Sequence, residues 1–257
     1  KYGRKTGVSF ICEDLLTYGY QINSSSTNAG GWSGSEMRTF CNSRVYDAFP
    51  TVWKSIRIYK ESMKKFIKRA FDLVCVFFAS IVFSPFFVIV FIAIKLEDGG
   101  PAFFKQERIG KSGKPFTLYK FRSMKVDAEK NGKPQLWSGD EDDRLTKVGK
   151  FIRNHHLDEL PQFLNIWKGD MTFVGYRPER QFFIDQIMEH NPDYARLYEM
   201  RPGVFSNATL YNGYTDTMEK MLKRLEMDLE YLDNNNLWID IAIIFKTGMS
   251  ILTGKKF

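Results

Sequence analysis

The sequence predicts a helix-rich α+β fold that combines a membrane-inserted helix, a globular domain and interfacial amphipathic helices. Three observations support this prediction. Residues Leu73–Ile94 form a run of 22 residues without a charge. Later stretches place apolar residues at helical spacing, the last of them over Leu237–Leu252, which fits a helix lying on the membrane or capping the domain. Between these helices, Phe116 and Leu118 alternate with polar residues, as in a strand.

The composition indicates an acidic partner. The net charge is +7 over 257 residues, which favours anionic lipid, a phosphorylated substrate or nucleic acid. Aromatic residues make up 16% of the chain, a content that fits a protein resting partly in lipid. The basic residues gather beside the apolar run, and the sequence carries no nucleic-acid-binding motif. We therefore expect membrane lipid as a partner and no nucleic acid.

Residues 1–59 differ in character from the rest of the chain. They contain a Ser-, Asn- and Gly-rich run, Asn23–Ser35, and no set of residues with catalytic spacing. The segment resembles a truncated accessory domain of unknown function. After it we place a basic lead-in with the membrane helix at residues 60–98, and the globular domain at residues 99–257.

The apolar run is long enough to cross a membrane. As a straight helix it would measure roughly 33 Å, against a hydrocarbon core of about 30 Å. Ser84 and Pro85 lie at its centre, where proline removes a backbone hydrogen bond and clashes with the carbonyl of Ile81. Basic residues flank both ends, so the positive-inside rule places both ends in the cytoplasm. A re-entrant helix satisfies both observations, but on the residues alone a proline-kinked crossing helix stays open.

An acidic pair, Asp158 and Glu159, is the strongest candidate for a site. Pro161 disfavours helix at the residue before it, so we expect the pair near a helix start or kink. Neighbours on a helix point about 100° apart, so one carboxylate can face a reacting centre while the other holds a metal. Arg177 follows a short strand-like piece and supplies a guanidinium. Carboxylates for a metal beside arginines for phosphate indicate phosphoryl chemistry, although such pairs are more often solvated helix faces.

The stretch between the membrane run and the predicted strand indicates a basic element at the membrane edge. Gly99–Gly110 contains Phe103 and Phe104, which would anchor it, and Arg108, which could meet lipid phosphate. The alternative is a surface hairpin with solvated charges.

Several motifs in a fixed order give residues 64–257 a specific resemblance. They resemble the bacterial sugar transferase family, the monotopic polyprenyl-phosphate phosphoglycosyl transferases. The matching motifs are GPAFFKQERIG at 100–110, KFRSM at 120–124, LDELPQFLN at 157–165, KGDMTFVG at 168–175, RPE at 177–179 and RPG at 201–203. The resemblance implies a membrane helix that breaks at Ser84-Pro85 and re-enters. It also implies a catalytic domain on the cytoplasmic side of a bacterial inner membrane.

The resemblance further implies an activity: transfer of a sugar 1-phosphate from a UDP-sugar to a polyprenyl phosphate such as undecaprenyl phosphate, releasing UMP, as the first membrane step of glycoconjugate biosynthesis. Asp158 would be the nucleophile, as in aspartyl-phosphate enzymes. Glu159 would hold Mg²⁺, which takes one or two carboxylates and bridges phosphate oxygens. The remaining expected residues are catalytic Lys120 and Arg153, and substrate-binding Arg177, Arg201 and Arg108.

The chain departs from the family pattern after Arg201. The family commonly continues T-G-W-A-Q-V-N-G-R, whereas this chain reads V-F-S-N-A-T-L-Y-N-G-Y. Tyr176 also stands where the family usually has proline. These changes affect donor recognition more than phosphoryl chemistry. They leave open a catalytically inactive, membrane-anchored scaffold of the same fold, and neither the sugar carried nor a homodimeric state follows from the sequence.

Overall fold

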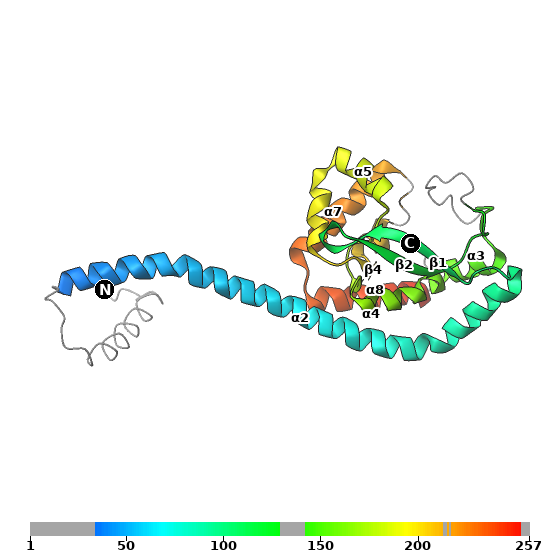
Figure 1. The fold of residues 1–257 in the computed structure, drawn as a ribbon, viewed down its shortest axis with the longest axis horizontal. Coiled ribbons are helices and arrows are strands. Elements are labelled where there is room, and N and C mark those ends of the chain that lie inside the picture. The colour runs from blue at the N-terminus through cyan, green and yellow to red at the C-terminus, as the bar shows by residue number, and fades with distance from the viewer. Residues whose placement is uncertain (1–33, 129–141, 213–214, 216, 253–257) are drawn as a thin grey trace. The chain divides into compact units, whose positions relative to one another are not determined.

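The computed structural model describes residues 34–128, 142–212, 215 and 217–252 (Figure 1). Contacts divide the chain into two compact units, Lys1–Glu61 and Ser62–Phe257. The expected accessory segment, residues 1–59, is described only from residue 34, as part of a helix. The description below therefore concerns the second unit.

Helix α2, Gly34–Asp98, contains the whole apolar run. Within the described residues, its segment 58–98 is the one helix long and apolar enough to cross a membrane. Most of its large apolar side chains are exposed; Phe78, Val82 and Ile89 each leave about 60% of their surface uncovered. Contiguous apolar surface of this extent is rare on a soluble domain. A lipid environment accounts for it.

The Ser84-Pro85 pair does not interrupt the helix, contrary to the break that the resemblance implied. Helical structure continues through both residues, and the ribbon curves along the second half of α2 (Figure 1). Pro85 has no N–H to donate to the carbonyl of Ile81. The Ser84 hydroxyl donates to that carbonyl at 2.8 Å instead, so the acceptor that proline leaves open is satisfied.

Both ends of the apolar run dock on the globular part. Near the first end, Asp72 accepts hydrogen bonds from the Thr172 hydroxyl at 2.7 Å and the Phe173 N–H at 3.1 Å. Beyond the second end, Asp98 pairs with Arg122. The core takes in side chains from both halves of the run, since Val76 packs with one hydrophobic cluster and Val90 and Ile94 with another.

A β-hairpin follows the helix, and its second strand contains Phe116 and Leu118, whose alternation predicts a strand. Strands β1, Phe103–Ile109, and β2, Pro115–Phe121, pair antiparallel, with Phe103 opposite Phe121. The turn η1, Lys111–Gly113, holds Ser112 and Gly113 at positive φ. Lys120 therefore lies near the end of β2, next to the last pair of the ladder.

The acidic pair lies in a segment made of three pieces: α3, Lys147–Asn154; the 3₁₀ turn η2, Leu157–Gln162; and α4, Phe163–Lys168. The Glu97 carboxylate accepts from the N–H of Lys147 at 2.7 Å and so caps the start of α3. His156 adopts a left-handed φ of 54° and separates α3 from η2.

Strand β3, Thr172–Val174, pairs in parallel with β4, Gly203–Phe205. The sequence analysis did not predict this pairing. The two backbones come very close, because a Cβ on Gly203 would lie 2.1 Å from the backbone nitrogen of Gly175. Only glycine fits such an approach.

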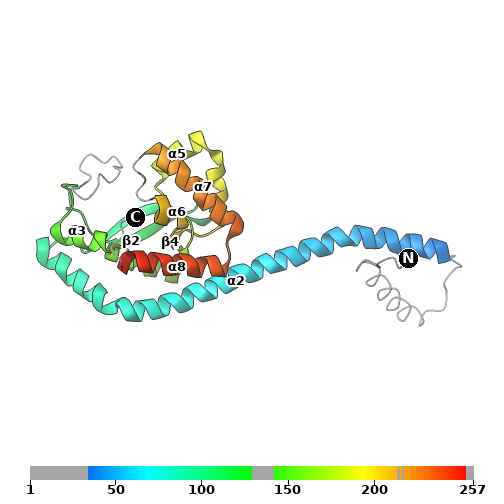
Figure 2. The ribbon, with the colours of Figure 1, turned by 180° about the vertical axis from the view of Figure 1, so that it is seen from behind.

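Helices from the C-terminal third pack around these strands (Figures 1 and 2). The helical stretch 181–200 is divided at Asn191 and Pro192, since proline starts a new turn in which the Asn191 side chain accepts from the N–H of Asp193. Met221, Leu225 and Leu229, which recur at helical spacing in the sequence, face the core. The elements are α5, Gln181–His190; η3, Pro192–Glu199; α6, Asn207–Asn212; α7, Met218–Asn234; and α8, Leu237–Leu252.

Candidate active site

The acidic pair lies buried on the short 3₁₀ turn η2. Asp158 is 5% exposed and Glu159 is 9% exposed, so the pair is not a solvated helix face. Pro161 sits inside the same turn, and His156 precedes it in the left-handed region. A 3₁₀ turn places neighbouring side chains about 120° apart, which lets the two carboxylates point in different directions from adjacent positions.

Two cations hold Glu159 ionised. Its Oε1 accepts hydrogen bonds from Lys120 Nζ at 2.7 Å and from Arg177 Nη2 at 2.9 Å. Burial by itself would raise the pKa of this carboxyl, but Lys120 and Arg177 outweigh it and hold the pKa well below the ordinary value. The β2 strand and the loop after β3 thus supply one cation each.

Asp158 has the opposite electrostatic character. Burial raises its pKa, and the negative charge of Glu159 raises it further. Lys120 Nζ lies 3.7 Å from Asp158 Oδ2 and lowers the pKa, as does Arg153, but burial prevails. The pair therefore combines a firmly ionised carboxylate with one whose charge is costly, a separation of pKa values typical of groups with different chemical roles.

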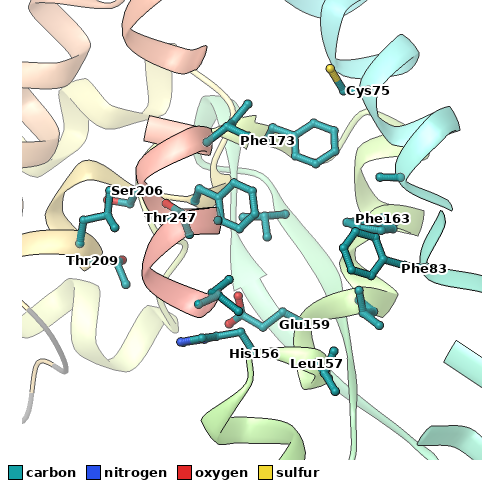
Figure 3. Close-up of a pocket in the computed structure, with 18 of the residues that line it drawn as sticks. Cys75, Phe83, His156, Leu157, Glu159, Phe163, Phe173, Ser206, Thr209 and Thr247 are labelled. Atoms are coloured by element: carbon teal, nitrogen blue, oxygen red, sulfur yellow. The ribbon is translucent and has the colours of Figure 1, made fainter. Parts of the chain in front are cut away.

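Both carboxylates line a cavity of about 970 Å³. Its polar lining includes the cations Arg177, Lys120 of β2, Arg153 of α3 and Arg224 of α7, together with hydroxyl groups of the β4–α6 segment. Its apolar lining comes mostly from α2 and α8, with Phe163 of α4. In the view of Figure 3, Ser206 and Thr209 lie across the cavity from Phe83 and Phe163, with Glu159 between the two sides. The cavity can therefore hold a charged, polar group and an apolar chain at one reacting centre.

The structure divides the five predicted arginine and lysine residues between the cavity and places outside it. Arg153 and Arg177 line the cavity with Lys120. Arg108 does not line it; its guanidinium bonds Glu179 at 2.8 Å. Arg201 also lies away from the cavity lining, and its Nε donates to the carbonyl of Gly169 at 2.8 Å, at the end of α4. Lys120, Arg153 and Arg177 can therefore reach a molecule in the cavity, whereas Arg108 and Arg201 make their contacts outside its lining.

A buried network behind the site was missed by the sequence analysis. Arg224 on α7 lines the cavity and pairs with Glu179 at 2.7 Å, so Glu179 bridges Arg224 and Arg108. Asp228, one turn further along α7, accepts from the Ser206 hydroxyl at 2.8 Å and from the backbone N–H of Arg177. Burial raises the pKa of Asp228 to about 7. Asp228 and Tyr231 match a D-x-x-Y motif of the family, a signal that could have found Asp228, whereas no motif marks Arg224.

The donor set fits a hard divalent cation only in part. Among the described residues, no group of three or more His, Cys, Asp or Glu side chains gathers in one place. Asp158 and Glu159 supply two carboxylates, and Oε1 of Glu159 already accepts from two cations. Mg²⁺ is commonly bound by one or two carboxylates, with substrate phosphates and water completing the octahedron. The pair fits that mode and does not fit an all-protein cage.

The relatives described here have names that give one type of activity, the transfer of a sugar phosphate to undecaprenyl phosphate. The chain is 42% identical over 189 residues to the UDP-N-acetylgalactosamine-undecaprenyl-phosphate N-acetylgalactosaminephosphotransferase of Aeromonas hydrophila, covering 74% of this chain and 44% of the relative. It is 40% identical over 187 residues to the UDP-glucose:undecaprenyl-phosphate glucose-1-phosphate transferase of Escherichia coli strain K12, covering 72% and 40%. With the Caulobacter vibrioides protein of that same name the identity is 38%, covering 72% and 70%.

The chain spans less than half the length of the first two of these relatives. The model of the bacterial sugar transferase family matches residues 63–254, a range that contains both the acidic pair and the apolar run. That match covers about three quarters of the chain. The chain belongs to the bacterial sugar transferase family.

Proposed function

We propose that this chain transfers a sugar 1-phosphate from a UDP-sugar to a polyprenyl phosphate and releases UMP. The observation that carries the proposal is a buried carboxylate pair between a cationic wall and an apolar wall of one cavity. The cationic wall suits the charged donor, and the apolar wall suits the lipid acceptor. The printed names of the relatives contain the same two substrates. The product would begin a lipid-linked glycan.

In the proposed mechanism Asp158 is the nucleophile. One of its carboxylate oxygens attacks the β-phosphorus of the donor, and the bond from that phosphorus to the bridging oxygen breaks. UMP leaves, and the sugar phosphate stays on Asp158. A phosphate oxygen of the acceptor then attacks the same phosphorus and displaces Asp158. Lys120, Arg153 and Arg177, which line the cavity, offset the charge that the phosphates bring.

Glu159 is the residue we propose for Mg²⁺, with substrate phosphates completing its coordination. The ion would supply charge neutralisation at the phosphates. Lys120 and Arg177 keep Glu159 ionised, so this ligand does not have to lose a proton first. Glu159→Gln keeps the shape and removes the charge, and its activity should stay low at any Mg²⁺ concentration. Recovery at high Mg²⁺ would contradict the assignment.

The proposed site of action is the inner membrane, with the globular part on the cytoplasmic side and α2 re-entrant. Two contacts support re-entry: Asp72 bonds Thr172 near one end of the apolar run, and Asp98 bonds Arg122 beyond the other. Both partners belong to the same compact unit, so a straight crossing would require one of these contacts to break. Basic residues at both ends agree with this orientation.

UMP formation separates the proposed enzyme from an inactive scaffold. Detergent-solubilised protein would be incubated with a UDP-sugar, Mg²⁺ and polyprenyl phosphate, and UMP measured against Asp158→Asn. Asp143→Asn is the matched control, because Asp143 is exposed. Release of UMP by the wild type and the control alone supports the proposal. Absence of UMP with every member of a UDP-sugar panel supports the scaffold.

A further inference from the structure

His156 stands out by its backbone conformation. Within the part of the chain that the structure describes, two residues other than glycine have a positive φ, Ser112 at 60° and His156 at 54°. Ser112 lies in the exposed hairpin turn η1, where the chain reverses direction. His156 lies between α3 and η2, immediately before the acidic turn. Residues other than glycine that are held in this disfavoured region cluster at functional sites.

The imidazole of His156 belongs to the lining of the cavity. The Glu159 N–H donates to the His156 carbonyl at 3.3 Å and closes the first turn of η2. Side chains three residues apart eclipse on a 3₁₀ turn, so the ring of His156 lies on the same side of the turn as Glu159. Figure 3 shows these two side chains next to each other, with the imidazole extending towards the side of the cavity that holds Ser206 and Thr209.

The neighbouring His155 has a different environment. His155 is exposed, its ring centroid lies 4.4 Å from that of Phe151, and its Nδ1 lies 2.8 Å from the Phe151 carbonyl oxygen. His156 is half-buried, and burial lowers the pKa of its imidazole. The negative charges of Glu159 and Asp158 act on this pKa in the opposite direction, so both carboxylates lie within electrostatic reach of the ring. His155 thus packs back on α3, whereas His156 faces the acidic pair.

We propose that the imidazole of His156 hydrogen-bonds the phosphate that is transferred, which is the β-phosphate of the donor. The inference rests on the proposed function and adds to it a further substrate-binding residue. Attack by Asp158 and binding of Mg²⁺ at Glu159 both require the β-phosphate next to the acidic pair, where the ring of His156 lies. A neutral imidazole has one N–H donor, and its hydrogen bond to a phosphate oxygen is charge-assisted. The contact is specific to the phosphate that UMP lacks.

His156→Gly separates the role of the ring from that of the backbone. Glycine adopts the left-handed conformation readily, so this variant keeps the turn and loses the imidazole. Ser112→Gly is the matched control, because it makes the same backbone change at an exposed position outside the cavity lining. Two further variants, His156→Asn and His156→Gln, place an amide N–H donor near the positions of Nδ1 and Nε2 of the imidazole, respectively.

The test compares the binding of UDP, which contains the β-phosphate, with that of UMP, which does not. Dissociation constants would be measured by isothermal titration calorimetry on the detergent-solubilised chain with Mg²⁺. We expect Kd for UDP to rise about ten-fold or more in His156→Gly, because a hydrogen bond to a charged group is lost, while Kd for UMP keeps its wild-type value. Ser112→Gly should leave both constants unchanged. His156→Asn or His156→Gln should regain much of the lost UDP affinity.

Three results would decide against these expectations. Wild-type affinity for UDP in His156→Gly would overturn the proposal, as would an equal loss of affinity for UDP and UMP. Failure of both amide variants to regain UDP affinity would show that the ring does not act as a hydrogen-bond donor, and would also overturn it. Absence of UDP and UMP binding by the wild type would instead overturn the proposed function.

Chemical modification of the wild type covers a His156→Gly protein that does not fold. Diethyl pyrocarbonate modifies accessible imidazoles, and the chain contains three histidines, so mass spectrometry can follow His156 separately from His155 and His190. UDP should protect His156 several-fold and UMP should not. His190, which is exposed on α5, should react equally in all samples. Equal modification of His156 with and without UDP would overturn the proposal.

Discussion

Lys120 Nζ donates to Glu159 Oε1 at 2.7 Å and lies 3.7 Å from Asp158 Oδ2, so one cation serves both buried carboxylates. Removing it takes away a cation that both buried negative groups share and leaves Arg153 to lower the pKa of Asp158. Arg177 remains for Glu159 only. This arrangement makes Lys120 the residue on which the charge state of the whole pair depends.

We expect Lys120→Met to lower UMP release by about 10²-fold or more, the usual cost of removing a group that stabilises charge at a reacting centre. Lys114→Met is the control, since Lys114 is exposed at the hairpin turn and lines no part of the cavity. Initial rates at saturating donor provide the measurement. A rate for Lys120→Met within three-fold of the control would show that the pair does not need this cation.

Asp158 should carry a covalent sugar phosphate. A carboxylate held close to phosphorus can attack in line, and two half-reactions spare the enzyme from holding donor and lipid together. Mass spectrometry of protein mixed with UDP-sugar alone should find the added mass on the peptide that contains Asp158. Steady-state kinetics should be ping-pong. Substantial turnover by Asp158→Asn, or a sequential kinetic pattern, would exclude this mechanism.

The raised pKa of Asp158 gives a pH prediction with a definite sign. Because only the ionised carboxylate attacks, the rate of UMP release should fall as pH decreases through this raised pKa. The acid limb should therefore lie at higher pH than that of an ordinary carboxylate. A pH–rate profile of the first half-reaction measures it. An acid limb at or below the pKa of an unperturbed aspartate would contradict the burial effect.

The same shift predicts a more stable inactive variant. A carboxyl whose folded pKa lies above its unfolded pKa costs stability once pH rises past the unfolded value. Asp158→Asn removes that cost, so its Tm should exceed the wild-type Tm at pH 8, and the difference should shrink towards pH 4. Asp143→Asn, at an exposed position, should show no such gain. A lower Tm for Asp158→Asn at pH 8 would be the contrary result.

Thr209 should contact the donor. Within the described residues, its hydroxyl oxygen is buried without a hydrogen-bond partner, and the residue lines the polar side of the cavity (Figure 3). Thr209→Val keeps the shape and should raise KM for the UDP-sugar about three- to ten-fold, the net value of one hydrogen bond. Thr117→Val on the exposed face of β2 is the control.

Inhibition by UDP identifies the part of the donor that Thr209 contacts. An equal loss of UDP affinity in Thr209→Val would place the contact on the uridine diphosphate part. Unchanged UDP affinity with weaker UDP-sugar binding would place it on the sugar. No change in either binding constant would mean that Thr209 does not recognise the donor.

The segments on the two sides of the apolar run should both be inaccessible from outside the cell. In a background without native cysteines, single cysteines at Lys64 and Lys114 should escape a membrane-impermeant maleimide in intact cells and react after permeabilisation. Pro85→Leu restores the backbone donor for Ile81 and should straighten the helix, exposing one of the two sites. Labelling of either site in the unmodified sequence would rule out re-entry.

The sequence by itself determined the elements whose signal is local. The uncharged run gives α2, alternation gives β2, and Pro161 places the acidic pair at a turn rather than inside a helix. The predicted cavity residues Lys120, Arg153 and Arg177 come from motifs in fixed order, and the structure gathers them with Asp158 and Glu159. Residue type and short spacing contain this information because the conformation of each of these elements depends on residues close to it in the sequence.

Only the tertiary structure decided which charges face the cavity. Arg108 and Arg201 match motifs, yet one pairs with Glu179 and the other bonds the carbonyl of Gly169. Arg224 has no motif and lines the cavity, because α7 packs against the loop that carries Glu179. The parallel pairing of β3 with β4 and the closeness of α8 to α2 likewise join segments far apart in the chain. The direction of a guanidinium depends on such packing, and spacing along the chain does not specify it.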